Sequence, residues 1–215
     1  MTTVGIVDYE MGNLRSVAKA IEKIGGRAIV SSDRAELSKA SHLILPGVGA
    51  FGDAIAELRR RNLVPWLKDW IESDAPFLGI CLGMQLLFEV SEEGGTHEGL
   101  GVLSGRVIRF DNRQHPANVH RKIPHMGWNR VQSTFDHDTM LDGISTNPFV
   151  YFVHSYYVVP EDPDVIWLTC DYGQQFCAAV RVKNMLATQF HPEKSQRDGL
   201  RLLKNFLDIP SLVTA

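Results

Sequence analysis

The strongest constraint in the sequence is a cysteine held between two glycines, in the segment Gly79-Ile80-Cys81-Leu82-Gly83. The apolar run 77–80 precedes it, as in a fully buried strand, and apolar residues at positions 82, 86 and 90 then predict a helix. A sharp strand-to-helix turn of this kind is a nucleophile elbow, in which glycines let other backbone approach closely. The helix N-terminus would favour the thiolate, which is the reactive form of cysteine. The alternative is a cysteine packed as a small hydrophobic residue, so a catalytic interpretation requires a general base elsewhere in the chain.

Composition and charge exclude several classes of protein. The 215 residues carry 22 basic and 25 acidic side chains, a net charge of −3, so we expect no binding to nucleic acid or to an anionic membrane. Three cysteines without a CxxC pair argue against a disulfide framework and a zinc site, and we expect no metal and no other cofactor. The sequence shows neither a signal-peptide pattern nor an apolar stretch long enough to cross a bilayer. We therefore predict a cytoplasmic protein.

The order of predicted elements indicates an α/β fold. Predicted strands at 4–7, 27–30, 42–45 and 77–80 alternate with helical patterns, including 53–61 and 63–72, which predicts a doubly wound, mostly parallel sheet. Beyond residue 100 strands dominate, and we expect added antiparallel strands. They are predicted at 105–110, 128–132, 149–157, 165–170, 176–182 and 185–190, before a final helix at 196–207. We predict one domain over residues 1–215, with the polar segment 111–122 as its least ordered part.

A general base for Cys81 is offered by His191-Pro192-Glu193. These residues follow the predicted strand 185–190, at the strand end where the sites of α/β proteins collect. Because residues i and i+2 of an extended segment point the same way, the carboxylate can orient the imidazole. The order nucleophile, histidine, acid differs from that of the α/β-hydrolases, in which the acid precedes the histidine. We interpret His42 as the start of a buried strand and His125 and His154 as structural or interface residues. The other histidines are interpreted as residues of polar loops: His97, His115, His120 and His137.

The loop Pro46-Gly47-Val48-Gly49-Ala50-Phe51-Gly52 contains Gly-x-Gly-x-x-Gly, the dinucleotide-binding pattern. However, it follows the third predicted strand rather than the first, and the acidic candidates Asp69 and Glu72 fall within a predicted helix. A flexible glycine turn is a second interpretation. We favour an oxyanion loop, in which a backbone N–H from Gly47 to Gly49 joins that of Leu82 around a tetrahedral intermediate. The predicted oxyanion residues are therefore Val48, Gly49 and Leu82.

The segments Gly79-Ile80-Cys81-Leu82-Gly83-Met84-Gln85 and His191-Pro192-Glu193 together resemble the class I (triad) glutamine amidotransferases. Four further stretches resemble the glutaminase subunits of imidazole glycerol phosphate synthases: Asp8-Tyr9-Glu10-Met11-Gly12-Asn13-Leu14, Pro46-Gly47-Val48-Gly49-Ala50-Phe51, Pro124-His125-Met126-Gly127-Trp128-Asn129 and Tyr151-Phe152-Val153-His154-Ser155-Tyr156-Tyr157. The resemblance covers residues 4 to about 207.

The resemblance implies a glutaminase with the triad Cys81, His191 and Glu193. Ammonia would pass to a synthase (cyclase) subunit with a (β/α)8 barrel, bound as a heterodimer, which makes imidazole glycerol phosphate and aminoimidazole carboxamide ribotide in histidine biosynthesis. The implied glutamine contacts are Gln85, Glu93, Ser155 and Tyr156. The implied partner contacts are Asn13, Trp128, Tyr151 and Lys194.

Several alternatives stay open from the residues alone. Glu93 could be a solvated acid in the turn 92–95, and Trp128 and Tyr151 could be strand aromatics in the core. For the whole chain, the alternatives are a dinucleotide-binding oxidoreductase, which leaves the triad unused, and a catalytically silent binding or redox-sensor subunit.

Overall fold

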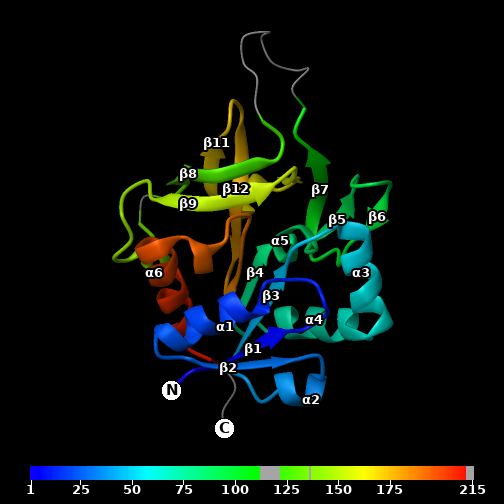
Figure 1. Cartoon of the computed structure of the whole chain (residues 1–215), viewed down its shortest axis with the longest axis vertical. Coiled ribbons are helices and arrows are strands. Elements are labelled where there is room, and N and C mark those ends of the chain that lie inside the picture. The colour runs from blue at the N-terminus through cyan, green and yellow to red at the C-terminus, as the bar shows by residue number, and fades with distance from the viewer. Residues whose placement is uncertain (112–121, 136, 212–215) are drawn as a thin grey trace.

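The computed structural model describes residues 1–111, 122–135 and 137–211, which form a three-layer α/β arrangement with a smaller second sheet (Figure 1). The helices are α1 (Leu14–Lys23), α2 (Arg34–Leu37), α3 (Phe51–Arg60), α4 (Leu63–Glu72), α5 (Leu82–Gln85) and α6 (Gln196–Leu207), with 3₁₀ turns at Thr139–Leu141, Pro163–Val165 and Pro192–Lys194. The main-sheet strands are β1 (Thr3–Val7), β2 (Arg27–Ser31), β3 (His42–Gly47), β4 (Phe77–Cys81), β8 (His125–Ser133), β9 (Phe149–His154), β11 (Ile166–Asp171), β12 (Gln175–Val182) and β13 (Met185–Thr188).

The main sheet has the order β2-β1-β3-β4-β13-β12-β11-β8-β9 among the described residues. The first five strands pair in parallel, and the remaining four continue the sheet by antiparallel pairing. The predicted doubly wound, mostly parallel sheet with antiparallel additions in the C-terminal half is therefore confirmed. Strand β4, which carries Cys81, lies near the centre, between β3 and β13.

Alternating side chains of the buried strands feed two hydrophobic cores. On β3, Ile44 joins the core that contains residues of α1 and α6, whereas Leu43 and Leu45 join the core that contains residues of α3 and α4. This alternation is the two-residue period of a strand, and it shows that the sheet is covered by helices on both faces (Figure 1). Parallel strands covered in this way read as continuous apolar runs, which is why 42–45 and 77–80 were recognisable.

Two predicted elements are wrong. The helix after Cys81 ends at Gln85, and the chain returns as strand β5 (Phe88–Ser91); the predicted strand 149–157 is two strands, β9 and β10 (Tyr156–Pro160), in different sheets. Both errors come from a second sheet, of order β10-β7-β5-β6, whose β7 (Leu103–Arg109) recruits β5 and β10 from either side. Strand β6 spans His97–Glu98. Tertiary pairing overrides the apolar spacing at 82, 86 and 90, which suits either type of element.

Other expectations concern single segments. The segment 111–122, predicted to be the least ordered part of the chain, lies almost wholly outside the described residues, as do the histidines His115 and His120 within it. Cys170 and Cys177 are buried free thiols. No helix in the described parts of the chain is long and apolar enough to cross a bilayer.

Candidate active site

Cys81 stands at a strained turn between β4 and α5. Its backbone has φ 56° and ψ −108°, a conformation that side-chain-bearing residues rarely adopt and that collects at functional sites. A Cβ atom on Gly83 would lie 1.9 Å from the carbonyl oxygen of Leu45, and one on Gly79 would lie 2.9 Å from that of Gly83. Both elbow positions therefore require glycine because other backbone occupies the space of a side chain.

His191 and Glu193 form a buried pair at the same edge of the sheet. Strand β13 pairs in register with β4 up to Thr188 opposite Ile80, so the chain carries His191 past the strand end next to the nucleophile. His191 Nδ1 lies 2.8 Å from Glu193 Oε1, and the two side chains are 3% and 1% exposed. The turn is held on β9, because the His191 N–H donates to the carbonyl of Tyr151 (2.9 Å).

The charge state of His191 follows from its neighbours. Burial lowers the pKa of His191, but interaction with Cys81 and with Glu193 outweighs it and raises this pKa to about 9. At neutral pH the ring is therefore an imidazolium. Among the described residues its Nε2 has no hydrogen-bond partner, which leaves this nitrogen available for proton transfer once Nδ1 has bonded to the carboxylate.

A cavity of about 330 Å³ opens in front of Cys81. It is lined by all the predicted oxyanion and glutamine-contact residues: Val48, Gly49, Leu82, Gln85, Glu93, Ser155 and Tyr156. The loop 46–49 reaches the cavity because Gly47 on β3 pairs with Cys81 on β4. A Cβ atom on Gly47 would lie 2.9 Å from the Leu82 Cβ, so this glycine packs against the elbow.

Glu93 is not a solvated turn residue. Its Oε2 accepts a hydrogen bond from the Phe51 N–H (2.9 Å), at the start of α3. The N-cap residue Ala50 makes no side-chain cap bond, so Glu93 satisfies one of the free N–H groups of the helix from across the cavity. One carboxylate thus lines the cavity and anchors the helix that follows the predicted oxyanion loop.

Sequence reasoning missed two residues of the site, Gln189 and Tyr9. Gln189 Nε2 lies 3.6 Å from Cys81 Sγ, and it sits two residues before His191, a spacing that could have drawn attention to it. The Tyr9 hydroxyl donates to the carbonyl of Pro46 (2.7 Å) from a fully buried position. Tyr9 therefore holds the beginning of the loop that contains Val48 and Gly49.

Three of the four predicted partner contacts gather beside His191. The Trp128 and Tyr151 rings are 6.0 Å apart, Lys194 Nζ lies 5.7 Å from the Tyr151 ring centre, and Tyr151 lies 6.5 Å from the His191 ring. Trp128 is 44% exposed, so its interpretation as a core aromatic is wrong. Asn13 caps α1, its Oδ1 accepting from the Ser16 N–H (3.4 Å).

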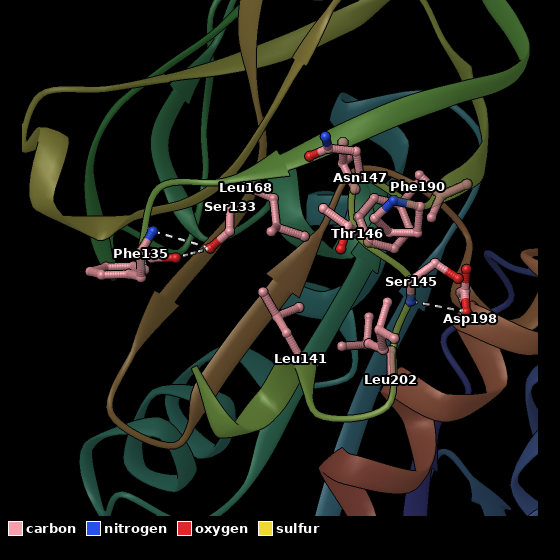
Figure 2. Close-up of a pocket in the computed structure, with 15 residues that line it drawn as sticks. Ser133, Phe135, Leu141, Ser145, Thr146, Asn147, Leu168, Phe190, Asp198 and Leu202 are labelled. Atoms are coloured by element: carbon pink, nitrogen blue, oxygen red, sulfur yellow. Dashed lines mark hydrogen bonds between the residues drawn. The ribbon is translucent and has the colours of Figure 1, made fainter. Parts of the chain in front are cut away.

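A second cavity, of about 360 Å³, lies between β8, β9 and α6 (Figure 2). Leu141, Leu168, Phe190 and Leu202 contribute apolar side chains, and among the described residues Asp198 is the one titratable side chain in its lining. Among the described residues, neither a cysteine nor a histidine lines this cavity, so the cavity at Cys81 is the candidate active site. No group of His, Cys, Asp and Glu in the described residues could hold a metal ion.

Comparisons with known proteins agree with this geometry. The family described as glutamine amidotransferase class-I matches residues 5–209. Imidazole glycerol phosphate synthase subunit HisH of Rhodopirellula baltica is 59% identical over 96% of this chain and 98% of its own length. The same subunit of Aquifex aeolicus is 52% identical over 96% of each chain.

Solved structures of low sequence identity share the fold. PurLQS from Thermotoga maritima matches with a TM-score of 0.73 at 18% identity, over 96% of this chain and 98% of that one. A structure described as a glutamine amidotransferase matches with a TM-score of 0.68 at 20% identity, over 95% and 96% of the two chains. The chain belongs to the class I glutamine amidotransferases and, within them, to the family of imidazole glycerol phosphate synthase HisH subunits.

Proposed function

We propose that the chain hydrolyses glutamine to glutamate and ammonia, as a single amidotransferase domain over residues 1–215. The observation that carries this function is the buried His191–Glu193 pair beside a cysteine elbow that opens into a cavity. The ammonia passes to a synthase subunit that makes imidazole glycerol phosphate and aminoimidazole carboxamide ribotide in histidine biosynthesis. The names of the relatives support this assignment.

The chemistry divides between Cys81 and His191. The Cys81 thiolate attacks the side-chain carboxamide carbon of glutamine, and a C–S bond forms as the carbonyl oxygen becomes an oxyanion. The His191 imidazolium then donates its proton to the leaving nitrogen, so that the C–N bond breaks, ammonia departs and a γ-glutamyl thioester remains. In the second half, neutral His191 takes a proton from the water that attacks the thioester, and collapse of this intermediate releases glutamate and regenerates the Cys81 thiolate beside the imidazolium.

Glu193 stabilises the charged form of His191 through this cycle. It accepts from Nδ1, which directs Nε2 toward the reacting atoms. The oxyanion accepts hydrogen bonds from the backbone N–H groups of Leu82 and of the Val48–Gly49 segment. Two N–H donors from opposite sides of Cys81 place the carbonyl oxygen between the loop and the elbow.

Glutamine is oriented by polar groups at the far side of the cavity. Glu93 pairs with the α-ammonium, while Ser155 and Tyr156 face the α-carboxylate. Both N–H groups of Gln85 are occupied, by the Tyr156 carbonyl and by Gln189 Oε1, each at 3.0 Å. Only Gln85 Oε1 can therefore serve the substrate, and it does so as an acceptor for the ammonium group.

The partner is a synthase subunit with a (β/α)8 barrel, which binds as a heterodimer over the exposed side chains of β8 and β9. Met126, Trp128 and Phe149 are 63%, 44% and 50% exposed, and aromatic residues of this kind anchor protein interfaces. The patch adjoins His191 through Tyr151. Ammonia that leaves Cys81 beneath this patch enters the partner without meeting bulk water.

Partner binding also controls the rate. Gly47 and Gly49 let the intervening peptides rest with a carbonyl rather than an N–H turned toward the oxyanion, and Gly49 has φ +114°. An oxyanion hole that lacks one donor loses about 10² to 10³ in rate. The free subunit is therefore a poor glutaminase, and docking with ligand in the barrel selects the conformation with the donor in place.

The test is glutamate release from glutamine by the lone chain, the heterodimer and the heterodimer with its nucleotide ligand. Cys81→Ala should abolish release in all three, while Cys170→Ala, at a buried thiol outside the cavity, should keep it. Near-normal turnover by Cys81→Ala would refute the mechanism. Equal rates in the three states would refute the switch and leave the triad standing.

A further inference from the structure

Two side-chain amides connect a backbone carbonyl to the sulfur of Cys81. Gln85 Nε2 donates to the carbonyl oxygen of Tyr156 and to Gln189 Oε1, each at 3.0 Å. Gln189 Nε2 in turn lies 3.6 Å from Cys81 Sγ. Gln85 and Gln189 are buried, 4% and 0% exposed, so these bonds are shielded from bulk water.

The direction of each hydrogen bond in this series follows from the Tyr156 carbonyl, which is its first group. A backbone carbonyl can only accept, so Gln85 must turn its NH₂ group toward Tyr156. The same NH₂ group faces Gln189, which must therefore present its oxygen to Gln85. Gln189 is left with its NH₂ group toward Cys81. The orientation of the amide at the sulfur is thus determined by the carbonyl of Tyr156.

The carbonyl of Tyr156 is itself held from a second side. It lies 2.8 Å from His154 Nδ1, and His154 Nε2 lies 3.1 Å from His125 Nδ1. Burial lowers the pKa of His125 to about 4 and that of His154 to about 3, so both rings stay neutral. Since His154 donates from Nδ1, its Nε2 accepts from His125 Nδ1. Each neutral ring therefore carries its proton on Nδ1.

The end of this hydrogen-bond series that lies farthest from Cys81 is on strand β8. Asn129 Nδ2 donates to the carbonyl of Asp171 (2.8 Å) and lies 3.4 Å from His125 Nε2. A carbonyl therefore determines the orientation of this amide as well, and it presents a donor to the one imidazole nitrogen that remains an acceptor. Hydrogen bonds in which every direction agrees strengthen one another in a dry environment.

We propose that Gln189 is a positioning residue of the glutaminase reaction, whose side-chain N–H, aimed through Gln85 by the Tyr156 carbonyl, holds the Cys81 thiolate for attack. A hydrogen bond to an ionised group is stronger than one to a neutral group, so the bond favours the thiolate over the thiol. This hydrogen bond comes from Gln189 and not from His191, so the sulfur is held while His191 is engaged in proton transfer. This role rests on the proposed nucleophile.

The test uses Gln189→Met, which removes the donor at similar length, and Gln189→Glu, which keeps an oxygen for Gln85 and turns an oxygen toward Sγ. The readout is the pH dependence of alkylation of Cys81 by iodoacetamide, located by peptide mass spectrometry. Cys170 and Cys177 do not interfere below pH 10, because burial raises the pKa of each thiol to about 12. Glutamine turnover by the heterodimer is measured in parallel.

Both variants should shift the alkylation profile upward by about one pH unit or more, because a hydrogen bond to a charged group is lost. Turnover at neutral pH should fall at least about tenfold, with KM changed much less. The matched control is Gln175→Glu, the same substitution at an exposed position on β12 whose amide donates to Thr169 Oγ1 (3.3 Å); it should change neither readout.

Two results would overturn the proposal. Gln189→Met with the wild-type alkylation profile would show that no donor acts on the thiolate, and a shift in Gln189→Glu alone would show an effect of charge only. In the unaltered protein, the Gln189 side-chain amide signal in NMR should move as the Cys81 thiol titrates, and a stationary signal would be equally decisive. Alkylation does not require glutamine, so the proposal can fail while the glutaminase function stands.

Discussion

Replacing Glu193 by glutamine separates the orientation of His191 from its electrostatic stabilisation. The substituted amide can turn its oxygen to His191 Nδ1, which now lies 2.8 Å from the carboxylate oxygen Oε1. The change removes the negative charge and puts an NH₂ group in place of Oε2, which has no hydrogen-bond partner among the described residues. The site is buried on both sides of the bond, at 3% and 1% exposure. Little solvent screening therefore reduces the effect of that charge.

The magnitude follows from the interaction of Glu193 with His191. Burial lowers the pKa of His191, but Cys81 and Glu193 together raise it from the usual 6.5 to about 9. Glu193→Gln replaces a hydrogen bond to a charged group by one to a neutral group, which costs about 1 to 1.5 kcal/mol, or roughly tenfold in kcat. His191→Ala removes proton transfer itself, for which about 10² to 10⁴ is typical.

The assay is glutamate release by the heterodimer as a function of pH. Because the protonated ring donates to the leaving nitrogen, kcat should decline as the pH rises through about 9. In Glu193→Gln the same decline should begin at lower pH. The free energy of unfolding should change in the same direction. The contribution of His191, whose pKa is raised in the folded protein, is complete below about pH 6.5 and is lost as the pH rises through the pKa of the folded state. A loss equal to that of His191→Ala, or an unmoved basic limb, would refute this division of roles.

Three further predictions address the cavity, the buried histidines and the exposed patch. Glu93→Gln should raise KM for glutamine with little change in kcat, since the amide can still cap α3 through the Phe51 N–H but cannot form an ion pair with the substrate ammonium. The control is Glu92→Gln, at an exposed neighbouring position. An unchanged KM in Glu93→Gln would place the ammonium site elsewhere. The pKa of His125 and of His154 is lowered by burial to about 4 and about 3, so the unfolded chain alone gains these protons below about pH 6.5. Unfolding free energy should then fall with decreasing pH by about 1.4 kcal/mol per pH unit for each ring, and urea titrations from pH 7 to pH 5 that lack this slope would contradict neutral buried rings. Trp128→Ala should weaken binding of the synthase subunit in titration calorimetry without changing the fold of the free chain, whereas Val30→Ala, exposed on β2, should not; equal affinities would move the interface away from β8.

Much of this protein was readable from its sequence, because those features depend on neighbouring residues. The elbow could be predicted since Gly79 and Gly83 flank Cys81, and the structure has a sharp turn there, with a positive φ at Cys81. Helix α6 was predicted with its observed ends, Gln196 and Leu207, because its apolar period is unbroken. The spacing of His191 and Glu193 likewise requires only that they share one short segment.

Other features depend on residues distant in sequence, and only the tertiary structure decided them. The residues of strand β5 were predicted to be helical because the strand's partner, β7, lies beyond two intervening turns. The predicted strand 149–157 is interrupted at Ser155 because β9 and β10 join different sheets. The acceptor for Gln85 is a carbonyl 71 residues away, and the donor to Cys81 comes from 108 residues away. A backbone carbonyl has no signature in the sequence, since every residue carries one. The direction of the amide at the nucleophile could therefore not be read before the chain was folded, because it is a property of packing rather than of composition or spacing.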